Sequence, residues 1–459
     1  MSKMNQMPIE KCVAINDNNP AITYATDKCM QCGMCATTCN QQIGIRNYYD
    51  LNKTGGDAIC IHCGQCTVSC PFGVIKEVDD TERVRQALLQ PGKTVVVSTS
   101  PAVRAALGEE FGMEMGSFVE GKMVALLRKL GFNYVFDTDF AADLTIMEEA
   151  SELVERITKG HKPLPMFTSC CPAWVKFAEY FYPQLLPNLS SAKSPISMIG
   201  PMIKTYFAAK ANIDPADIVH VALTPCTAKK FEILRPELND GIKAAGHPEL
   251  ADTDIVITTR EVARWAKEAG IDFPSLEDDT YDRLLGESTG AGVIFGNTGG
   301  VMEAALRTAY KLITGQDAPA ALFALEAVRG FEGIKEATLN IGGMDINVAV
   351  IYGTQNARNF IDKMADSPKQ YHFIEVMTCP GGCIGGGGQP INLRMNKDKL
   401  KEARAKALYR SDESKTLRAS YENPEIKAIY ADFLGKPLSE KSEELLHTTY
   451  TDRSKDLGE

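Results

Sequence analysis

Cysteine is the residue that most constrains what this chain of 459 residues can fold into. Of its fourteen cysteines, only Cys12 stands outside a short motif, and we expect it to be a small buried apolar residue. Residues 1–10 contain no apolar export segment, so the expected compartment is the cytoplasm, where cysteines stay reduced. Reduced cysteines gathered in tight motifs predict metal binding.

Two cysteine runs with the same spacing lie within residues 21–84, and the second is followed by Pro71. Each run is C-x2-C-x2-C-x3-C, the spacing of two-cluster bacterial ferredoxins, in which the fourth cysteine of a run binds the cluster of the other run. Paired C-x2-C motifs also suit zinc, but four evenly arranged cysteines in each of two runs favour iron–sulfur clusters. The predicted ligands are Cys29, Cys32, Cys35 and Cys70 for one [4Fe–4S] cluster, and Cys60, Cys63, Cys66 and Cys39 for the other.

From Lys93 onward, short β-branched runs alternate with helical patterns, which predicts parallel sheets covered by helices. Ligands of such sheets bind outside the carboxyl ends of the strands, so the loops that follow strands are expected to converge on one site. The glycine-rich turn at 296–300 either approaches that site through its backbone or is a simple turn. Strands are predicted at 94–97, 218–223, 254–257, 347–351 and 371–376, and helices at 102–110, 260–269, 301–313 and 356–365.

Three further cysteine segments lie far apart, at 168–174 (TSCCPAW), 224–232 (TPCTAKKFE) and 375–390 (EVMTCPGGCIGGGGQP). Together they closely resemble the three signature segments of the iron-only, or [FeFe], hydrogenases. The resemblance covers nearly the whole chain, including the charged helical tail after Lys399. It implies an N-terminal extension at 1–20, an α+β ferredoxin-like domain at 21–84, an α/β two-lobed catalytic domain at 85–450 and a C-terminal tail at 451–459.

By that resemblance, the three segments hold the H-cluster, a [4Fe–4S] cluster joined through one cysteine to a two-iron unit that carries CO, cyanide and a bridging dithiolate. Lys229 resembles the lysine that donates a hydrogen bond to a cyanide. A buried ammonium needs an anionic partner, and a cyanide would supply one. The neighbouring Lys230 is expected at the surface. Met377 resembles the methionine that packs against the bridging carbonyl. The implied cluster ligands are Cys171, Cys226, Cys379 and the bridging Cys383, and the implied surroundings of the two-iron unit add Ser100, Pro101 and Pro225.

Cys170 is left without a cluster, and the resemblance gives it the role of passing protons to the two-iron unit. Glu149 and Glu152 lie three residues apart on a predicted helix, with Arg156 four residues beyond Glu152 on the same face. They match the relay glutamates and arginine of the family, and Ser190 matches its relay serine. Taken alone, the glutamates and arginine would suit a solvated acidic helix face; beside the three segments, the relay is the preferred interpretation.

The resemblance implies reversible reduction of protons to H2, with electrons delivered through two [4Fe–4S] clusters and protons through Glu152, Ser190, Glu149 and Cys170. The expected electron partner is a ferredoxin or flavodoxin, or a flavin-bearing subunit that oxidises NADH, and maturation proteins would install the two-iron unit. A net charge of −10 argues against nucleic acid, and no apolar run of about 18 residues predicts a membrane span. The alternatives are a hydrogen sensor, which commonly carries a signalling domain, and a non-catalytic iron–sulfur scaffold, which lacks the residues around the cluster.

Four positions depart from the commonest pattern of the family. Thr224 stands where a methionine is usual, Ala173 where a glycine is usual, and Ile196 where a glutamine is common. At Ser100-Pro101-Ala102 the small residues are exchanged. By the resemblance each lies near the two-iron unit, so we expect them to change its redox poise and the catalytic bias rather than the reaction.

Overall fold

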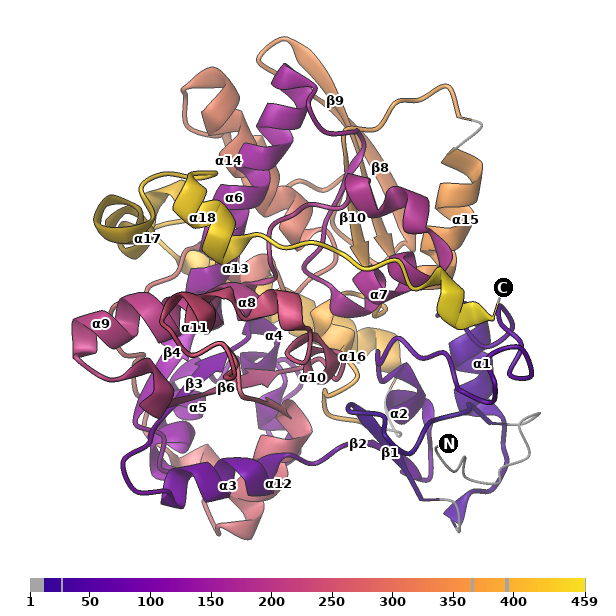
Figure 1. Ribbon diagram of the computed structural model, residues 1–459, viewed down its shortest axis with the longest axis vertical. Helices are drawn as coiled ribbons and strands as arrows, with labels where there is room; N and C mark the ends of the chain where they lie inside the picture. Colours follow the sequence, from indigo (N-terminus) through magenta and orange to yellow (C-terminus); the bar gives the residue numbers. More distant parts are fainter. Residues whose placement is uncertain (1–11, 26–27, 365–366, 393–395, 459) are drawn as a thin grey trace.

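The structure is a computed structural model that describes residues 12–25, 28–364, 367–392 and 396–458. The export-signal prediction concerns residues 1–10, which lie outside this part. The described chain forms a small N-terminal unit and two larger lobes, each lobe built on a four-stranded sheet (Figure 1). The C-terminal end of the chain returns to the small unit.

The small unit is an antiparallel pair of short strands with two short helices. Its elements are β1 (Ile22–Tyr24), α1 (Met34–Gln41), α2 (Gln65–Ser69) and β2 (Ile75–Glu77). Cys12 is buried in its core, as predicted.

The two cysteine runs of this unit share one backbone conformation. Gln31 and His62 occupy the same place in each run, and their φ angles are 53° and 60°. Gly33 and Gly64 follow the second cysteine of each run, with φ angles of 79° and 69°. Both runs therefore take the same left-handed turn directly before a helix, and the unit is an internal repeat.

The first lobe carries four parallel strands in the order β4 (Tyr134–Asp137), β3 (Thr94–Thr99), β6 (Ile218–Thr224) and β7 (Ile255–Thr258). Helices cover both faces, as predicted for a parallel sheet. One face packs against α3 (Thr81–Leu89), α5 (Glu120–Lys129) and α12 (Thr259–Glu268). The other face packs against α6 (Thr138–Lys159), α8 (Pro195–Met202), α17 (Pro424–Ile429) and α18 (Glu440–Leu446).

The expected boundary at residue 84 falls inside α3, because Val84 and Ala87 belong to the core of the first lobe. The helix predicted over 102–110 is interrupted: it consists of α4 (Pro101–Arg104) and a separate 3-10 turn, Leu107–Phe111.

The second lobe carries a mixed sheet in the order β5 (Met166–Phe167), β10 (Phe373–Met377), β9 (Met344–Tyr352) and β8 (Ile334–Ile341). Alternate side chains of β9 enter different cores, as the two-residue repeat of a strand requires. Val348 and Val350 pack with α13 (Gly290–Ile294) and α14 (Gly300–Thr314). Ala349 and Ile351 pack with α7 (Pro172–Phe181) and α15 (Thr354–Met364).

The expectation of purely parallel sheets is wrong at one edge of the second lobe. β8, which was not predicted, runs antiparallel to β9 and pairs Ile341 with Met344. The connecting Gly342 and Gly343 have φ angles of 60° and 87°. A two-residue hairpin loop of this kind needs positive φ at both positions, which glycine supplies without a steric cost.

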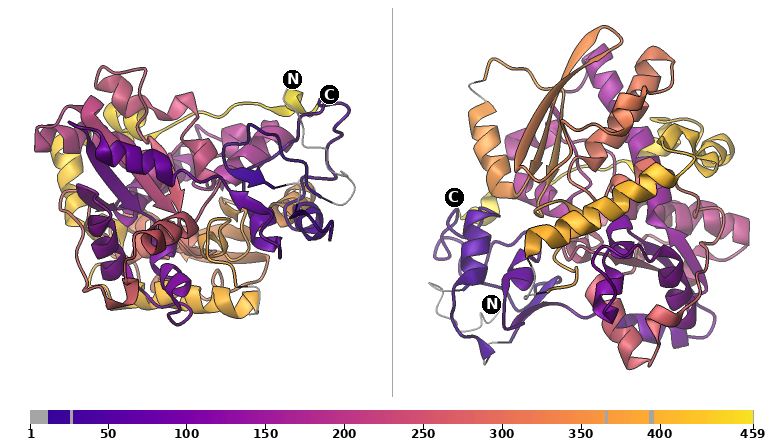
Figure 2. Two further views of the ribbon diagram at one scale, coloured as in Figure 1. Left: turned by 90° about the horizontal axis from the view of Figure 1, so that it is seen from below. Right: turned by 180° about the vertical axis from the view of Figure 1, so that it is seen from behind.

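Two long helices join the lobes. α6 spans 22 residues and contributes Phe140 to the core of the first lobe and Ile146 to that of the second. α16 (Lys397–Ser414) runs across the back of the molecule (Figure 2). The remaining short helices are α9 (Ala208–Ala211), α10 (Lys229–Glu232) and α11 (Asp240–Ala244).

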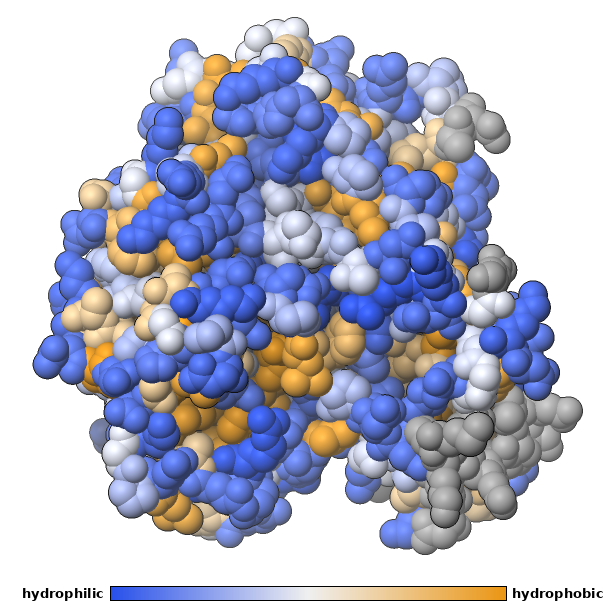
Figure 3. Space-filling model, in the orientation of Figure 1, coloured by the Kyte–Doolittle hydropathy of each residue, from blue (hydrophilic) through white to orange (hydrophobic). Residues whose placement is uncertain are grey.

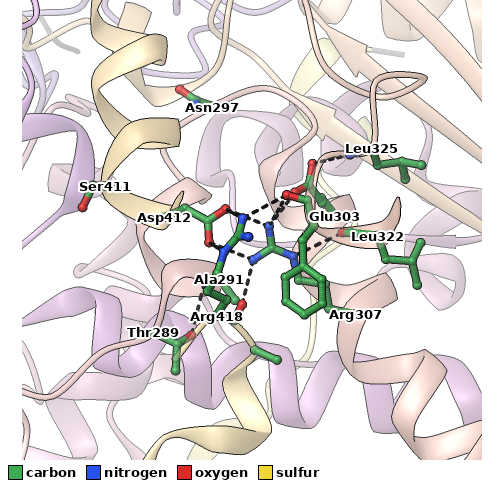
Figure 4. A network of polar contacts seen from close by, with 12 residues as sticks. Thr289, Ala291, Asn297, Glu303, Arg307, Leu322, Leu325, Ser411, Asp412 and Arg418 are labelled. Carbon is green, nitrogen blue, oxygen red and sulfur yellow. Dashed lines mark hydrogen bonds and ion pairs between the residues drawn. The ribbon is translucent and has the colours of Figure 1, made fainter. Parts of the chain in front are cut away.

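A buried charge network fastens α16 to α14 (Figure 4). Arg307 of α14 donates to Asp412 of α16 at 2.9 Å and to Glu303 at 2.5 Å. Arg418 donates to Asp412 at 2.7 Å. Each charged group of this network thus has a partner of opposite charge at hydrogen-bond distance, which offsets the cost of burying it.

The face of the molecule drawn in Figure 3 is mostly hydrophilic, with apolar residues in scattered patches.

Candidate functional site

The predicted cofactor residues come together where four strands end. Ser100 follows β3, Pro225 follows β6 and Thr378 follows β10, while Cys170 lies three residues beyond β5. Because β3 and β6 belong to the first sheet and β5 and β10 to the second, the site lies between the two lobes. The prediction that the loops converge at the carboxyl ends of strands is confirmed.

A cavity of about 70 Å³ occupies this place, whereas one water molecule needs about 10–15 Å³. Its wall is mostly apolar, which excludes water from whatever it binds. Every residue that sequence analysis assigned to the cluster or the two-iron unit lines it: Cys171, Cys226, Cys379, Cys383, Ser100, Pro101, Pro225, Lys229 and Met377, together with Cys170. Gly296 also lines it, so the glycine-rich turn approaches the site through its backbone.

Three of the predicted ligand thiols in this cavity have raised pKa values. Burial, followed by the nearness of Cys171, raises the pKa of Cys226 to about 12. Burial, followed by the nearness of Cys226, raises the pKa of Cys379 and Cys383 well above the usual range. Thiols so deeply buried together become thiolates only when a strong positive charge is bound among them.

The backbone around these thiols is fixed by local contacts. Cys171 is the N-cap of α7, and its Sγ lies 3.4 Å from the Thr378 hydroxyl and 3.5 Å from the Thr378 N–H, which donates to it. Gly382 has a φ of 93°, and a Cβ there would lie 2.6 Å from the backbone nitrogen of Thr298. Only glycine therefore lets the third segment pack against the 296–300 turn. Sequence analysis did not identify Thr378, although it stands directly before Cys379.

Lys229 is buried, as predicted, and its three donors are all used. Its Nζ donates to Ser194 Oγ at 2.7 Å, to Glu232 Oε2 at 2.7 Å and to the Cys170 carbonyl at 3.2 Å. Glu232 thus supplies the anionic partner that sequence analysis sought in a cyanide. Its position three residues after Lys229 on α10 was the signal that could have revealed it.

The expectation that Lys230 lies at the surface is wrong. Lys230 is 3% exposed, and its Nζ bonds to Asp80 at 2.6 Å and to Glu261 at 3.0 Å. Asp80 is the N-cap of α3, and Glu261 lies on α12. Long-range charge pairing of this kind leaves no trace in the local sequence.

Glu149, Glu152 and Arg156 of α6 are buried, so the solvated-face alternative is wrong for them. Glu152 is surrounded by donors: Arg156 at 2.7 Å, Lys162 at 2.9 Å, Ser190 Oγ at 2.9 Å and the Ser191 N–H at 3.0 Å. Burial alone would raise the pKa of Glu152, but Arg156 and Lys162 lower it to about 2. Sequence analysis missed Lys162, which lies on the loop after α6.

Glu149 has the opposite environment. Neither of its carboxyl oxygens has a hydrogen-bond partner among the residues that the structure describes. Burial, and then the charge of Glu152, raises the pKa of Glu149 to about 8. Burial, and then Glu149, raises the pKa of the Cys170 thiol well above its usual range. Glu149 and Cys170 are therefore protonated at neutral pH.

Two of the four unusual positions line the cavity and two do not. Ile196 and Thr224 belong to its wall, and the Thr224 hydroxyl accepts from the N–H of Cys226 at 3.3 Å. Ala102 and Ala173 are instead fully buried in neighbouring hydrophobic cores. Only Ile196 and Thr224 line the cavity themselves, and the expectation that all four positions lie near the two-iron unit stays a prediction.

A second cavity, in the N-terminal unit, is lined by four cysteines from both runs: Cys39, Cys60, Cys63 and Cys66. This is the set predicted for one [4Fe–4S] cluster. Cys29, Cys35 and Cys70 pack in the adjoining core, while Cys32 is exposed.

Several short contacts join the segments beside the two cavities. Thr227, the neighbour of Cys226, donates from its hydroxyl to the carbonyl of His62 at 2.7 Å. A Cβ on Gly387 would lie 2.5 Å from the carbonyl oxygen of Cys63, so the glycine run of the third segment packs directly on the N-terminal unit. Gln65 and Thr67 donate to carbonyls of the same glycine run.

Two adjoining cavities lined by thiols, one of them within the unit that repeats a cysteine spacing, are what an iron–sulfur protein requires. Residues 93–387 match the family model described as iron only hydrogenase large subunit, C-terminal domain, and residues 398–453 match that of the iron hydrogenase small subunit. The chain belongs to the iron-only hydrogenases. Among the described helices, none combines the length and apolarity needed to cross a membrane.

Individual proteins agree with this assignment. The NADP-reducing hydrogenase subunit HndD of Solidesulfovibrio fructosivorans is 46% identical over 96% of this chain and 76% of its own length. Iron hydrogenase 1 of Clostridium pasteurianum is 43% identical over 97% of this chain and 78% of its own. An apo variant of the [FeFe]-hydrogenase HydA1 from Chlamydomonas reinhardtii superimposes with a TM-score of 0.71 at 41% identity, covering 82% of this chain and 99% of that one.

The cofactors of this family, the H-cluster and accessory [4Fe–4S] clusters, fit the donors that are present. Both cavities offer soft thiol ligands, which iron–sulfur clusters require. The mostly apolar wall of the larger cavity suits a two-iron unit with small ligands.

Proposed function

We propose that this protein catalyses the reversible reduction of protons to H2 with ferredoxin as its electron partner. The H-cluster would be held by Cys171, Cys226, Cys379 and Cys383, and it supplies the metal chemistry of forming and splitting H2. The observation that carries the proposal is the single cavity that gathers all the predicted cofactor residues together with Cys170.

In this proposal, the chain moves protons through residues with contrasting environments. Glu152, ionised and held by four donor groups, accepts from the Ser190 hydroxyl at 2.9 Å. Glu149 and Cys170 are both protonated at neutral pH; Glu149 is near both Glu152 and Cys170, and Cys170 lines the cavity. Neighbouring carboxyl groups with separated pKa values are the usual arrangement of acid–base pairs. Arg156 positions Glu152 rather than carrying the proton itself.

Electrons would enter through the N-terminal unit. The proposed ligand sets are Cys29, Cys32, Cys35 and Cys70 for the outer cluster, and Cys39, Cys60, Cys63 and Cys66 for the inner one. The contact between His62 and Thr227 supports a short route from the inner cluster to Cys226. The name of the HndD relative supports a second candidate electron partner, a subunit that exchanges electrons with a nicotinamide cofactor.

The experiment is H2 production by the matured protein with reduced ferredoxin, comparing wild type with Cys170→Ala. Removing a group that transfers protons costs about 100-fold or more, so turnover should nearly vanish while the iron content stays unchanged. Cys12→Ala, at the other cysteine outside the proposed ligand sets, should retain activity. Full activity of Cys170→Ala would contradict the relay, and no H2 production by the wild type would contradict the proposed function.

A further inference from the structure

One buried cation of the catalytic domain faces the N-terminal unit and has no ion-pair partner among the residues that the structure describes. Lys176, on α7, is 6% exposed. Within the described chain, no carboxylate oxygen lies within 4.0 Å of its Nζ, the distance needed for an ion pair. Its Nζ lies 2.7 Å from His62 Nε2, 3.9 Å from the ring centroid of Phe231 and 5.5 Å from that of Tyr180. A buried ammonium without an anion is costly, so the position calls for a counter-charge.

The hydrogen bonds of His62 fix its tautomer. The side-chain oxygen of Asn19 accepts from the N–H groups of Ala21 and Ile22, both at 3.0 Å. That oxygen also lies 3.2 Å from His62 Nδ1, so Nδ1 must carry a proton and donate. Nε2 then has a free lone pair for the ammonium of Lys176. His62 is therefore a neutral spacer, and the positive charge belongs to Lys176.

The surroundings of Lys176 do not neutralise it. The nearby carboxylate of Glu179 is already engaged by Arg235 at 2.6 Å and by Arg453 at 2.9 Å. Burial lowers the pKa of Lys176 to about 8, and Cys60 is the foremost neighbour opposing that shift. The ammonium form thus prevails at neutral pH.

We infer that Lys176 is the counter-ion of the inner accessory cluster, the one assigned to Cys39, Cys60, Cys63 and Cys66, and that it raises the reduction potential of that cluster. The inference rests on the ligand assignment of the proposed function. A cluster gains one negative charge on reduction, and a fixed cation in a buried setting stabilises the more negative state. His62, within the same cysteine run, holds the ammonium at a set place.

The position of Lys176 on α7 connects its charge with electron transfer to the catalytic site. α7 begins directly after Cys171, a proposed H-cluster ligand, and Lys176 lies on that helix. The same cation therefore lies on the element that joins the inner cluster to the catalytic site. A higher potential at the inner cluster favours electron transfer from the outer cluster to it.

The test is an anaerobic redox titration of the full chain with its [4Fe–4S] clusters, followed by electron paramagnetic resonance. Lys176→Met removes the charge, Lys176→Gln removes the charge but keeps a donor for His62, and Lys176→Arg keeps the charge. Lys53→Met removes an exposed lysine that lines the same surface hollow and is the matched control. The Cys32→Ser variant, which should lack the outer cluster, assigns the signals.

We expect Lys176→Met and Lys176→Gln to make the inner cluster harder to reduce, by about tenfold in the ratio of reduced to oxidised cluster, or about 59 mV. The potential of the outer cluster should shift less. Lys176→Arg should leave the potential of the inner cluster close to wild type because it keeps the charge. Lys53→Met should do so because solvent screens an exposed charge. If Lys176→Met fails to retain iron, Lys176→Gln decides the result.

An unchanged inner potential in the variants without the charge, or an equal shift in Lys53→Met, would overturn the inference. The titration does not require hydrogen turnover. An active hydrogenase with an unshifted potential therefore refutes only the role of Lys176, whereas an inactive protein with a shifted potential refutes only the proposed reaction.

Discussion

Single residues on α6 show how far environment separates identical side chains. Glu149 and Glu152 are three residues apart and both buried, yet the pKa of one is raised to about 8 and that of the other lowered to about 2. The difference arises because Glu152 accepts from Arg156, Lys162, Ser190 and the Ser191 backbone, whereas Glu149 accepts from no described residue. Sequence spacing predicted that the pair shares a face; it could not predict which carboxyl group would be protonated.

Glu149 should make stability depend on pH. Its pKa is raised from 4.5 to about 8, so between these values the unfolded chain ionises the group and the folded chain does not. Its contribution is fully present below about pH 4.5 and is lost as pH rises to about 8, at roughly 1.4 kcal/mol per pH unit. Glu149→Gln should therefore raise the thermal midpoint relative to wild type more at the upper end of this range than at the lower.

The measurement is thermal unfolding at both ends of that pH range, with the same cluster content in each sample. Glu155→Gln changes a partly exposed glutamate of the same helix and is the control. A stability difference between wild type and Glu149→Gln that does not change with pH would mean that the carboxyl group titrates normally.

At the scale of elements, sequence patterns located most strands and helices but missed those whose cause is distant. The strands at 94–97, 218–223 and 254–257 were found because β-branched runs mark a buried parallel sheet. β8 was missed because its first residues reverse the usual pattern, with Ile334 exposed and Lys335 buried, although Gly342-Gly343 is a recognised hairpin signal. The break between α4 and the following 3-10 turn likewise has no clear sequence mark.

The charge network between α14 and α16 should be a main support of the C-terminal segment. Asp412 is fully buried and accepts from both Arg307 and Arg418 (Figure 4). Asp412→Ala leaves two guanidinium groups without their shared partner, which typically costs about 3–5 kcal/mol when the charges are buried. We expect a lower thermal midpoint and faster proteolysis within residues 397–414.

Glu413→Ala, next to Asp412 but exposed, is the matched control and should behave as wild type. Equal thermal midpoints and digestion rates for Asp412→Ala and Glu413→Ala would show that the network does not hold α16 in place.

At the scale of the whole molecule, the sequence predicted the parts but not how they join. The cysteine spacings indicated a ferredoxin-like unit and a catalytic domain, because cluster ligands obey short local rules. The joint depends on contacts between distant segments, such as Arg260 with Glu77, Thr227 with His62, and Lys230 with Asp80. No local pattern encodes which of many distant charged residues will meet, so Lys230 was misplaced.

Loss of the outer cluster should slow H2 production driven by ferredoxin more than H2 production driven by a small-molecule electron donor. Cys32 is exposed, so Cys32→Ser removes a proposed ligand with little effect on packing. We expect the iron content to fall by about four atoms per chain, the content of one cubane cluster. Ferredoxin-driven H2 production should fall most of the way to background while production with reduced methyl viologen falls far less.

Iron analysis and the two assays on the same preparation check this. Equal losses with both donors would mean that electrons from ferredoxin do not enter through the outer cluster.

The central claim is that the cavity between the lobes holds a two-iron unit with CO and cyanide. Infrared spectroscopy of the anaerobically matured protein tests it most directly, because these ligands absorb where protein groups are silent. The account predicts sharp cyanide and carbonyl bands that shift when H2 and then CO are added. No such bands in a matured protein that still contains iron and sulfide would contradict it and leave an iron–sulfur scaffold as the function.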